Sequence, residues 1–247
     1  MAEVTLLETR GLARHFDGLK AVDVVDFTLN VGEIRAIIGP NGAGKSTFVS
    51  LLSGRIPPSA GQVFFDGKDV TNLPAFKRVR LGIAYTFQIT NIYPSLTVLE
   101  NIEIAVQNRL KPSLFGGASE AQIQSEATLA AQAVGLGDRI GDTAGNLAYG
   151  HQRLLEVAMG LGLEPKLLIL DEPTQGLSDA EIKNFIEVVK RVNETATVLI
   201  IEHNMDVVLA LADRITVLER GRLLAEGTPD EIVENVAVQA AYLGEPA

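Results

Sequence analysis

A glycine-rich segment that ends in lysine, serine and threonine carries the strongest chemical signal in this sequence of 247 residues. It has the form G-x-x-x-x-G-K-[ST] and consists of Gly39, Pro40, Asn41, Gly42, Ala43, Gly44, Lys45, Ser46 and Thr47. Apolar residues 34–38 precede it and residues 48–52 follow in a helix-like run, which is the strand–loop–helix context of a phosphate-binding loop. Such a loop points backbone N–H groups and the positive end of a helix at an anion. We expect Lys45 to reach the β- and γ-phosphates of a nucleotide and Ser46 to offer its hydroxyl to Mg²⁺.

Two carboxylates, Asp171 and Glu172, directly follow the apolar run 167–170. An unbroken apolar run of this length indicates a buried parallel strand, and ligands bind at the carboxyl ends of such strands. We expect Asp171 to hold Mg²⁺ through water and Glu172 to polarise the water that attacks the γ-phosphate. The alternative is a solvated charge pair at the start of a helix.

Two further polar side chains follow predicted strands. Gln88 comes after residues 81–87, and His203 comes after residues 197–201. A glutamine can coordinate a metal or orient water but cannot act as a base, and a single histidine after a strand is usually a surface or capping residue. Their position at strand ends, together with the phosphate loop, favours a role at one phosphate site.

The segment Leu147-Ala148-Tyr149-Gly150-His151-Gln152-Arg153 precedes a helical run over residues 154–161. Gly150 and the start of this helix could supply backbone donors to an anion. Without the other motifs, a plain helix cap explains the segment equally well.

These motifs alternate with predicted strands and helices, which indicates an α/β fold. The first 35 residues read as short strands with turns at Asp17-Gly18 and Val31-Gly32, and residues 63–68 read as a strand that enters a turn. Between about residues 97 and 165 helix signals dominate, which predicts a helical insertion. Ser178 with Glu181, and Thr228 with Glu231, are capping-box patterns that predict helix starts.

Composition narrows the class of partners. The formal net charge of −10 argues against a nucleic-acid partner, because phosphate backbones attract basic surfaces. The sequence has no cysteine, so disulfides and thiolate metal sites are excluded. We find neither a signal-peptide pattern nor an apolar run of the roughly 18 residues that span a membrane, so we expect a cytoplasmic protein that could dock on a membrane protein.

Together the motifs resemble the nucleotide-binding subunits of ABC transporters, over essentially the whole chain. Residues 39–47 resemble Walker A, residues 167–172 resemble Walker B with its catalytic glutamate, and residues 147–150 resemble the signature motif. The resemblance implies that Gln88 is the Q-loop residue and His203 the switch histidine. It also implies that Phe16 stacks on adenine and that Ala148, Tyr149 and Gly150 contact nucleotide. Candidate Mg²⁺ ligands are then Ser46, Gln88 and Asp171.

The implied fold is an ABC ATPase: a mixed or parallel core sheet with a phosphate loop, an N-terminal antiparallel β region and a helical subdomain. We expect a single domain over residues 1–247, with a core at about 1–95 and 165–247 and a helical subdomain at about 96–164. The implied cofactors are ATP and Mg²⁺. The implied partners are transmembrane permease subunits, a second ATPase subunit and, indirectly, a solute-binding protein. A heterodimer of ATPase subunits is favoured over a homodimer, and the chain is expected to be peripheral on the inner face of the cell membrane.

A narrower resemblance is to importer ATPases for branched-chain amino acids, of the LivG type. It is carried by residues 18–22, 147–150, 201–205 and 241–245, and by the loop at 110–117. Related ATPases serve urea, amides, aromatic acids or lipopolysaccharide export, and these remain alternatives. Three residues depart from the general pattern: Ala148 replaces serine, His151 replaces glutamine, and Ser178 replaces aspartate or asparagine.

Two other classes compete with a transport ATPase. A soluble ABC ATPase acting on ribosomes usually carries two cassettes, and one acting on DNA separates its Walker motifs by long coiled coils, for which this chain lacks sustained heptads. The acidic charge argues against both. A nucleotide sensor without catalysis is disfavoured by the presence of Glu172 and His203.

Overall fold

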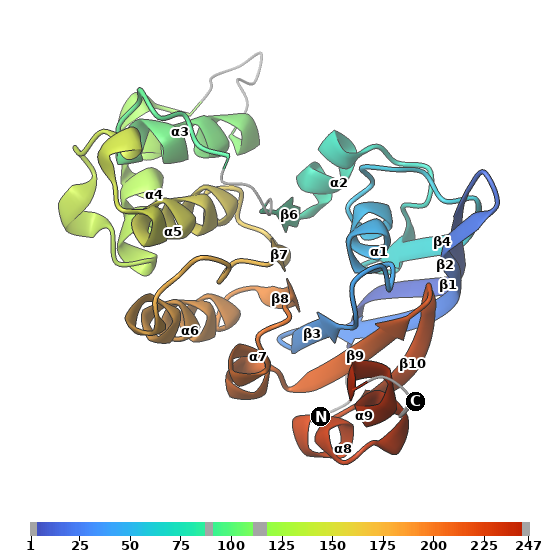
Figure 1. The fold of residues 1–247 in the computed structure, drawn as a ribbon. Helices are drawn as coiled ribbons and strands as arrows, with labels where there is room; N and C mark the ends of the chain where they lie inside the picture. Colours follow the sequence, from blue (N-terminus) through green and yellow to red (C-terminus); the bar gives the residue numbers. More distant parts are fainter. Residues whose placement is uncertain (1–3, 87–90, 111–117, 244–247) are drawn as a thin grey trace. The chain divides into compact units, whose positions relative to one another are not determined.

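The computed structural model describes residues 4–86, 91–110 and 118–243 (Figure 1). The chain divides into two compact units. The first unit contains residues 1–81 and 197–247, and the second contains residues 82–196.

An antiparallel sheet forms the N-terminal part of the first unit, with strand order β2-β1-β4-β5. Its strands are β1 (Thr5–Phe16), β2 (Leu19–Asn30), β4 (Ala60–Phe65) and β5 (Lys68–Asp69). The prediction of several short strands was wrong here, because β1 and β2 are each 12 residues long. Register shifts between the two strands explain the error, since a bulge breaks the alternation of side chains while the strand continues. The predicted turn at Asp17-Gly18 is confirmed, and both residues have the positive φ of a two-residue hairpin.

The first unit also contains four strands in the order β10-β9-β3-β8. They are β3 (Ile34–Ile38), β8 (Thr197–Ile201), β9 (Arg214–Glu219) and β10 (Arg222–Gly227). Strands β8 and β9 run parallel to β3 on either side, and β10 pairs antiparallel with β9. Every residue of β3 and β8 is buried, as their apolar composition predicts. The carboxyl ends of β3 and β8 therefore meet at one edge.

The described residues of the first unit form five helices: α1 (Lys45–Leu52), α2 (Ala75–Leu81), α7 (Met205–Leu211), α8 (Pro229–Val233) and α9 (Val236–Leu243). Helix α1 packs on the antiparallel sheet, where Phe48 meets Phe27 edge to face at 5.4 Å. The buried Arg78 of α2 donates hydrogen bonds of 2.8 Å to the carbonyls of Leu51 and Leu52. A cation at these carbonyls stabilises the carboxyl end of α1, and burial lowers the pKa of Arg78 to about 10.

The second unit contains two parallel strands, β6 (Ile83–Tyr85) and β7 (Leu167–Asp171), and four α-helices in its described residues. The helices are α3 (Val98–Arg109), α4 (Glu120–Ala133), α5 (Tyr149–Leu161) and α6 (Asp179–Asn193). Short 3₁₀ turns at Gly137–Arg139 and Ala144–Asn146 connect α4 to α5. The capping boxes predicted at Ser178 and Thr228 are confirmed. The predicted fold class is confirmed: the protein is α/β with an N-terminal antiparallel sheet, parallel pairing around β3 and a run of helices between β6 and β7.

Candidate functional site

The phosphate-loop segment connects the buried strand β3 to helix α1, as its sequence predicts. Gly44 is the N-cap of α1, and Gly39, Gly42 and Gly44 have φ values of 150°, 79° and 100°. These backbone angles are rarely open to residues with a Cβ atom. A Cβ atom at Gly39 would also lie 2.2 Å from the carbonyl oxygen of Leu218, and one at Gly44 would lie 2.2 Å from that of Ala21. Both glycines are therefore required by close backbone packing within the first unit.

Lys45 is buried and lies in the first turn of α1. Its ammonium donates to the carbonyl oxygens of Gly39 at 2.6 Å and Pro40 at 3.2 Å. The lysine thus folds back over its own loop, while Asn41, Gly42 and Ser46 are exposed. A cation inside a glycine-rich loop at a helix start is the chemistry of an anion site.

His203 lies at the same strand edge as the phosphate loop. In the parallel pair of β3 and β8, Ile37 lies opposite Ile201, so the loop after Ile38 and the segment after Ile201 leave the sheet together. The Glu202 carboxylate, only 1% exposed, accepts from the backbone N–H groups of His203 at 3.0 Å and Asn204 at 3.2 Å. These bonds fix the backbone on either side of the exposed histidine. Sequence reasoning missed Glu202.

Phe16 ends strand β1 beside the hairpin turn and is 40% exposed. The Arg14 guanidinium lies over its ring, 4.4 Å from the ring centre. This partial exposure argues against a purely structural role for Phe16 in the core. The stacking of this ring on adenine stays a prediction.

In the second unit, Asp171 is the last residue of β7 and is 5% exposed. Glu172 follows with a φ of 46°, in the left-handed region that non-glycine residues seldom occupy. Such a conformation in a non-glycine residue is often found at functional sites. The predicted pair therefore consists of Asp171, whose side chain is buried, and Glu172, whose backbone is strained. The next helix, α6, begins only at Asp179, so the two carboxylates are not a charge pair at a helix start.

Sequence reasoning also missed Tyr85, whose hydroxyl donates to the Oδ2 atom of Asp171. Tyr85 lies opposite Ile169 in the parallel pair of β6 and β7, two residues before the carboxylate on that strand. The two partners are 86 residues apart in sequence, so no local pattern could have indicated the contact.

The signature-like segment forms the start of α5, with Ala148 as its N-cap. Tyr149 is 43% exposed, and Gly150 is buried against Glu181 of α6. A Cβ atom at Gly150 would lie 2.4 Å from Oε1 of Glu181. Hydrogen bonds from the backbone and hydroxyl of Ser178 lower the pKa of Glu181, and the backbone N–H of Gly150 adds to this effect. The Gly150 donor that the sequence assigns to an anion thus already contacts a carboxylate of this chain.

A buried ion pair lies further along α5. Arg153 donates to Glu156 at 2.9 Å, and the other oxygen of Glu156 accepts from the backbone N–H of Asn91 at 2.7 Å. Burial raises the pKa of Glu156, although its hydrogen bonds with Asn91 and Arg153 act in the opposite direction. Gln88 lies outside the described residues, and Asn91 is the first described residue after it.

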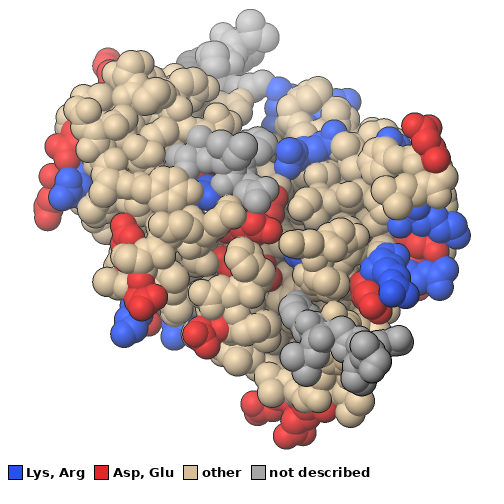
Figure 2. All heavy atoms as spheres, in the orientation of Figure 1, with Lys and Arg blue, Asp and Glu red and all other residues tan. Residues whose placement is uncertain are grey.

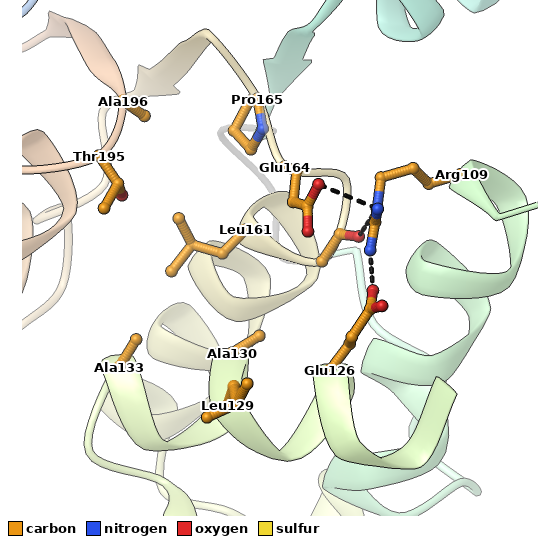
Figure 3. A pocket seen from close by; sticks show the side chains of 11 residues that line it. Arg109, Glu126, Leu129, Ala130, Ala133, Leu161, Glu164, Pro165, Thr195 and Ala196 are labelled. Carbon is orange, nitrogen blue, oxygen red and sulfur yellow. Dashed lines mark hydrogen bonds and ion pairs between the residues drawn. The ribbon is translucent and has the colours of Figure 1, made fainter. Parts of the chain in front are cut away.

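A hollow within the second unit lies away from these motifs. It has a volume of about 340 Å³. Figure 3 shows Arg109 at one side of it, paired with the Glu126 carboxylate of α4. Arg109 also pairs with the Glu164 carboxylate, at a distance of 2.9 Å. Leu129, Leu161 and Pro165 contribute apolar walls. Because Arg109 is already held by carboxylates and the lining contains no predicted site residue, we do not assign the nucleotide to this hollow.

The described residues contain no group of three or more His, Cys, Asp or Glu side chains that could hold a metal ion. Among the same residues, no helix has the length and apolarity needed to span a membrane. Figure 2 shows acidic side chains gathered over α8, and basic and acidic side chains side by side over the antiparallel sheet of the first unit.

Comparison with known proteins identifies the class. The ABC transporter family profile matches residues 22–175, and a profile of branched-chain amino acid ATP-binding cassette transporters matches residues 222–247. The chain belongs to the ABC transporter ATP-binding family, whose members are ATPase subunits of transporters.

Particular relatives are similar over nearly their whole length. The high-affinity branched-chain amino acid transport ATP-binding protein LivG of Escherichia coli K12 is 40% identical, over 97% of this chain and 98% of that protein. The probable LivG protein of Archaeoglobus fulgidus is 39% identical over 97% of this chain and 95% of its own. A ribose import ATP-binding protein of Rubrobacter xylanophilus is 36% identical over 92% of this chain but only 46% of that protein.

Solved structures agree with the fold. A nucleotide-free ATP-binding cassette from an ABC transporter superposes with a TM-score of 0.85 at 28% identity, covering 98% of this chain and 100% of that one. The ADP conformation of an ATP-binding cassette superposes with the same TM-score, identity and coverage. The prediction of an ABC ATPase that binds nucleotide is confirmed at the level of the family.

Proposed function

We propose that this chain is the ATP-hydrolysing subunit of an importer for branched-chain amino acids. The observation that carries the proposal is the phosphate loop, where a buried lysine lies among glycines that the backbone requires. The LivG-type relatives, matched along almost their full length, support the choice of solute. The ribose import protein is matched over less than half of its own length, so it has less weight in the choice of solute.

The proposed roles follow the chemistry of each side chain. Lys45 and the loop N–H groups bind the β- and γ-phosphates, and Phe16 stacks on adenine. Glu172 acts as the base that polarises the attacking water, and His203 contacts the γ-phosphate. Ala148, Tyr149 and Gly150 are proposed to act on the nucleotide of a second ATPase subunit.

The oxygen donors fit Mg²⁺. The exposed Ser46 hydroxyl and the buried Asp171 carboxylate are hard ligands of the kind that Mg²⁺ prefers together with phosphates and water. We propose that Ser46, Gln88 and Asp171 serve this ion, which when bound neutralises charge on the phosphates. The helical subdomain over residues 96–164 and the docking of the chain on permease subunits at the inner membrane face are parts of the same proposal.

Replacing the catalytic carboxylate tests the hydrolysis. In Glu172→Gln we expect Mg²⁺-dependent ATP hydrolysis to fall by roughly two orders of magnitude or more, because a glutamine cannot accept the proton of the attacking water. ATP binding should survive, since Lys45 and Ser46 are unchanged. Phosphate release and equilibrium binding of ATP measure the two quantities. Hydrolysis at the wild-type rate in this variant would contradict the role of Glu172.

The choice of solute is tested by transport. We expect ATP-driven uptake of leucine, isoleucine or valine into vesicles that contain this chain with its permease subunits and its partner ATPase subunit. The same vesicles with Glu172→Gln serve as the control. Uptake of ribose or urea instead of these amino acids would show that the proposed solute is wrong, while the assignment as a transport ATPase would stand.

A further inference from the structure

The Tyr85 hydroxyl is placed by strand geometry to reach Asp171. Strands β6 and β7 are parallel, with Tyr85 opposite Ile169, and the backbone N–H of Thr86 donates to the Ile169 carbonyl at 2.9 Å. Side chains two residues apart on a strand share a face, so Tyr85, Ile169 and Asp171 point to one side of the pair. The tyrosine side chain then extends along the strand direction to the Oδ2 atom of Asp171.

A buried carboxylate needs a partner, and the chemistry of the partner matters. Asp171 is 5% exposed, and an unpartnered carboxylate at that depth would be costly. A lysine or arginine would satisfy it but would compete with a metal ion for its charge. A phenol hydroxyl is neutral and donates one hydrogen bond, so it orients the carboxylate and leaves its negative charge available.

We propose that Tyr85 is a positioning residue for Asp171: its hydroxyl holds Oδ2, so that Oδ1 is presented toward the Mg²⁺ of the bound nucleotide. The proposal rests on the function proposed above. Partners that hydrogen-bond a metal-binding carboxylate fix its orientation, and their loss typically weakens metal binding.

Removing the hydroxyl alone tests the proposal. In Tyr85→Phe we expect the Mg²⁺ concentration at half-maximal nucleotide binding to rise by about tenfold. Binding is measured with a fluorescent ATP analogue in the Glu172→Gln background, so the readout does not depend on hydrolysis. Mn²⁺ binding in the presence of ATP, followed by electron paramagnetic resonance, reports the metal directly and should weaken by a similar factor.

A matched control separates positioning from folding. Tyr93→Phe makes the same chemical change at a tyrosine of the second unit that is 50% exposed, and it should leave the Mg²⁺ dependence unchanged. Nucleotide affinity measured in EDTA and the thermal unfolding midpoint should be nearly equal in wild type, Tyr85→Phe and Tyr93→Phe. If Tyr85→Phe is poorly folded, Tyr85→Met gives a second side chain without the hydroxyl.

The outcomes are distinct. An unchanged Mg²⁺ dependence in folded Tyr85→Phe would overturn the proposal. An equal loss of nucleotide affinity with and without Mg²⁺ would also overturn it, because the tyrosine would then support only the fold. If the Glu172→Gln background itself binds no ATP, that background is at fault, and the tyrosine is judged in the otherwise wild-type protein by the Mg²⁺ dependence of binding of a non-hydrolysable ATP analogue, which Tyr85→Phe must weaken. If the wild-type protein binds no ATP analogue either, the proposed function fails.

Discussion

At the scale of single residues, the backbone of Glu172 adopts a conformation that is costly for a residue with a Cβ atom. In the left-handed region, the Cβ atom of a non-glycine residue costs roughly 1–2 kcal/mol that glycine does not incur. Glycine has an opposing cost, because it loses about 0.5–1 kcal/mol more conformational entropy on folding than alanine does. The φ of 46° places Glu172 in that region. The chain thus keeps a carboxylate where a glycine would fit better, which is expected where function rather than stability selects the residue.

This strain can be measured. We expect Glu172→Gly to be more stable than Glu172→Ala by about 1 kcal/mol in urea unfolding, although neither variant should hydrolyse ATP. Lys183, exposed within helix α6, is the control: there Gly should be about 1 kcal/mol less stable than Ala. The same order at both positions would show that the backbone of Glu172 relaxes without strain.

Phe16 provides a second prediction at this scale. Stacking of a base on an aromatic ring is worth about 1–3 kcal/mol, so Phe16→Ala should weaken ATP binding roughly tenfold or more. Because the ring is 40% exposed, the thermal unfolding midpoint should change little. Phe76→Ala, at a phenylalanine of the first unit that is 57% exposed, should leave ATP affinity unchanged. Unchanged affinity in folded Phe16→Ala would exclude the stacking role.

At the scale of secondary-structure elements, Glu181 joins the start of α6 to the signature-like segment. Its pKa lies below the ordinary value of 4.5 because the backbone and hydroxyl of Ser178 donate to the carboxylate, with the Gly150 N–H contributing. A lowered pKa in the folded state means that the ionised form stabilises the fold. This stabilisation is fully present above about pH 4.5 and is lost as the pH falls through the folded-state pKa.

Glu181→Gln should therefore be less stable than wild type at pH 7, and the difference should shrink as the pH falls below 4.5. Urea unfolding at a series of pH values measures the difference. Glu187→Gln, at an exposed glutamate of the same helix, controls for the change in net charge. A stability difference that stays constant from pH 7 to pH 3 would show that shape, not charge, makes the Glu181 contact.

The elements that could be predicted are those whose signals are local. The capping boxes at Ser178 and Thr228 and the Asp17-Gly18 turn each involve contacts within a few residues, and the sequence alone places them. The buried strands before Asp171 and His203 are read from apolar runs. The Tyr85 contact with Asp171 and the Glu181 contact with Gly150 depend on how distant segments pack. Local patterns therefore locate the motifs but not the side chains that hold them.

At the scale of the whole molecule, the chain carries a complete phosphate loop but an incomplete signature. Ala148 is the N-cap of α5, where the general family pattern has a serine hydroxyl, and the N–H of Gly150 already meets the Glu181 carboxylate. We propose that in the assembled transporter each ATP lies between the phosphate loop of one subunit and the signature of the other. In a homodimer, both sites would lack the hydroxyl. A heterodimer with an ATPase that has a full signature would keep one site complete.

The difference between the two arrangements is large enough to measure. A hydrogen bond to a charged group is worth about 1.5–3 kcal/mol, which is a factor of roughly 10 to 100 in binding. We therefore expect the chain mixed with a partner ATPase that has a full signature to hydrolyse ATP at least about tenfold faster than the chain alone. Ala148→Ser, which supplies the hydroxyl, should narrow this gap by raising the rate of the isolated chain. Size-exclusion chromatography with ATP in the Glu172→Gln background reports dimerisation apart from turnover. If the isolated wild-type chain dimerises on ATP and hydrolyses it as fast as the mixed pair, the missing hydroxyl has no consequence and the unequal pair is wrong.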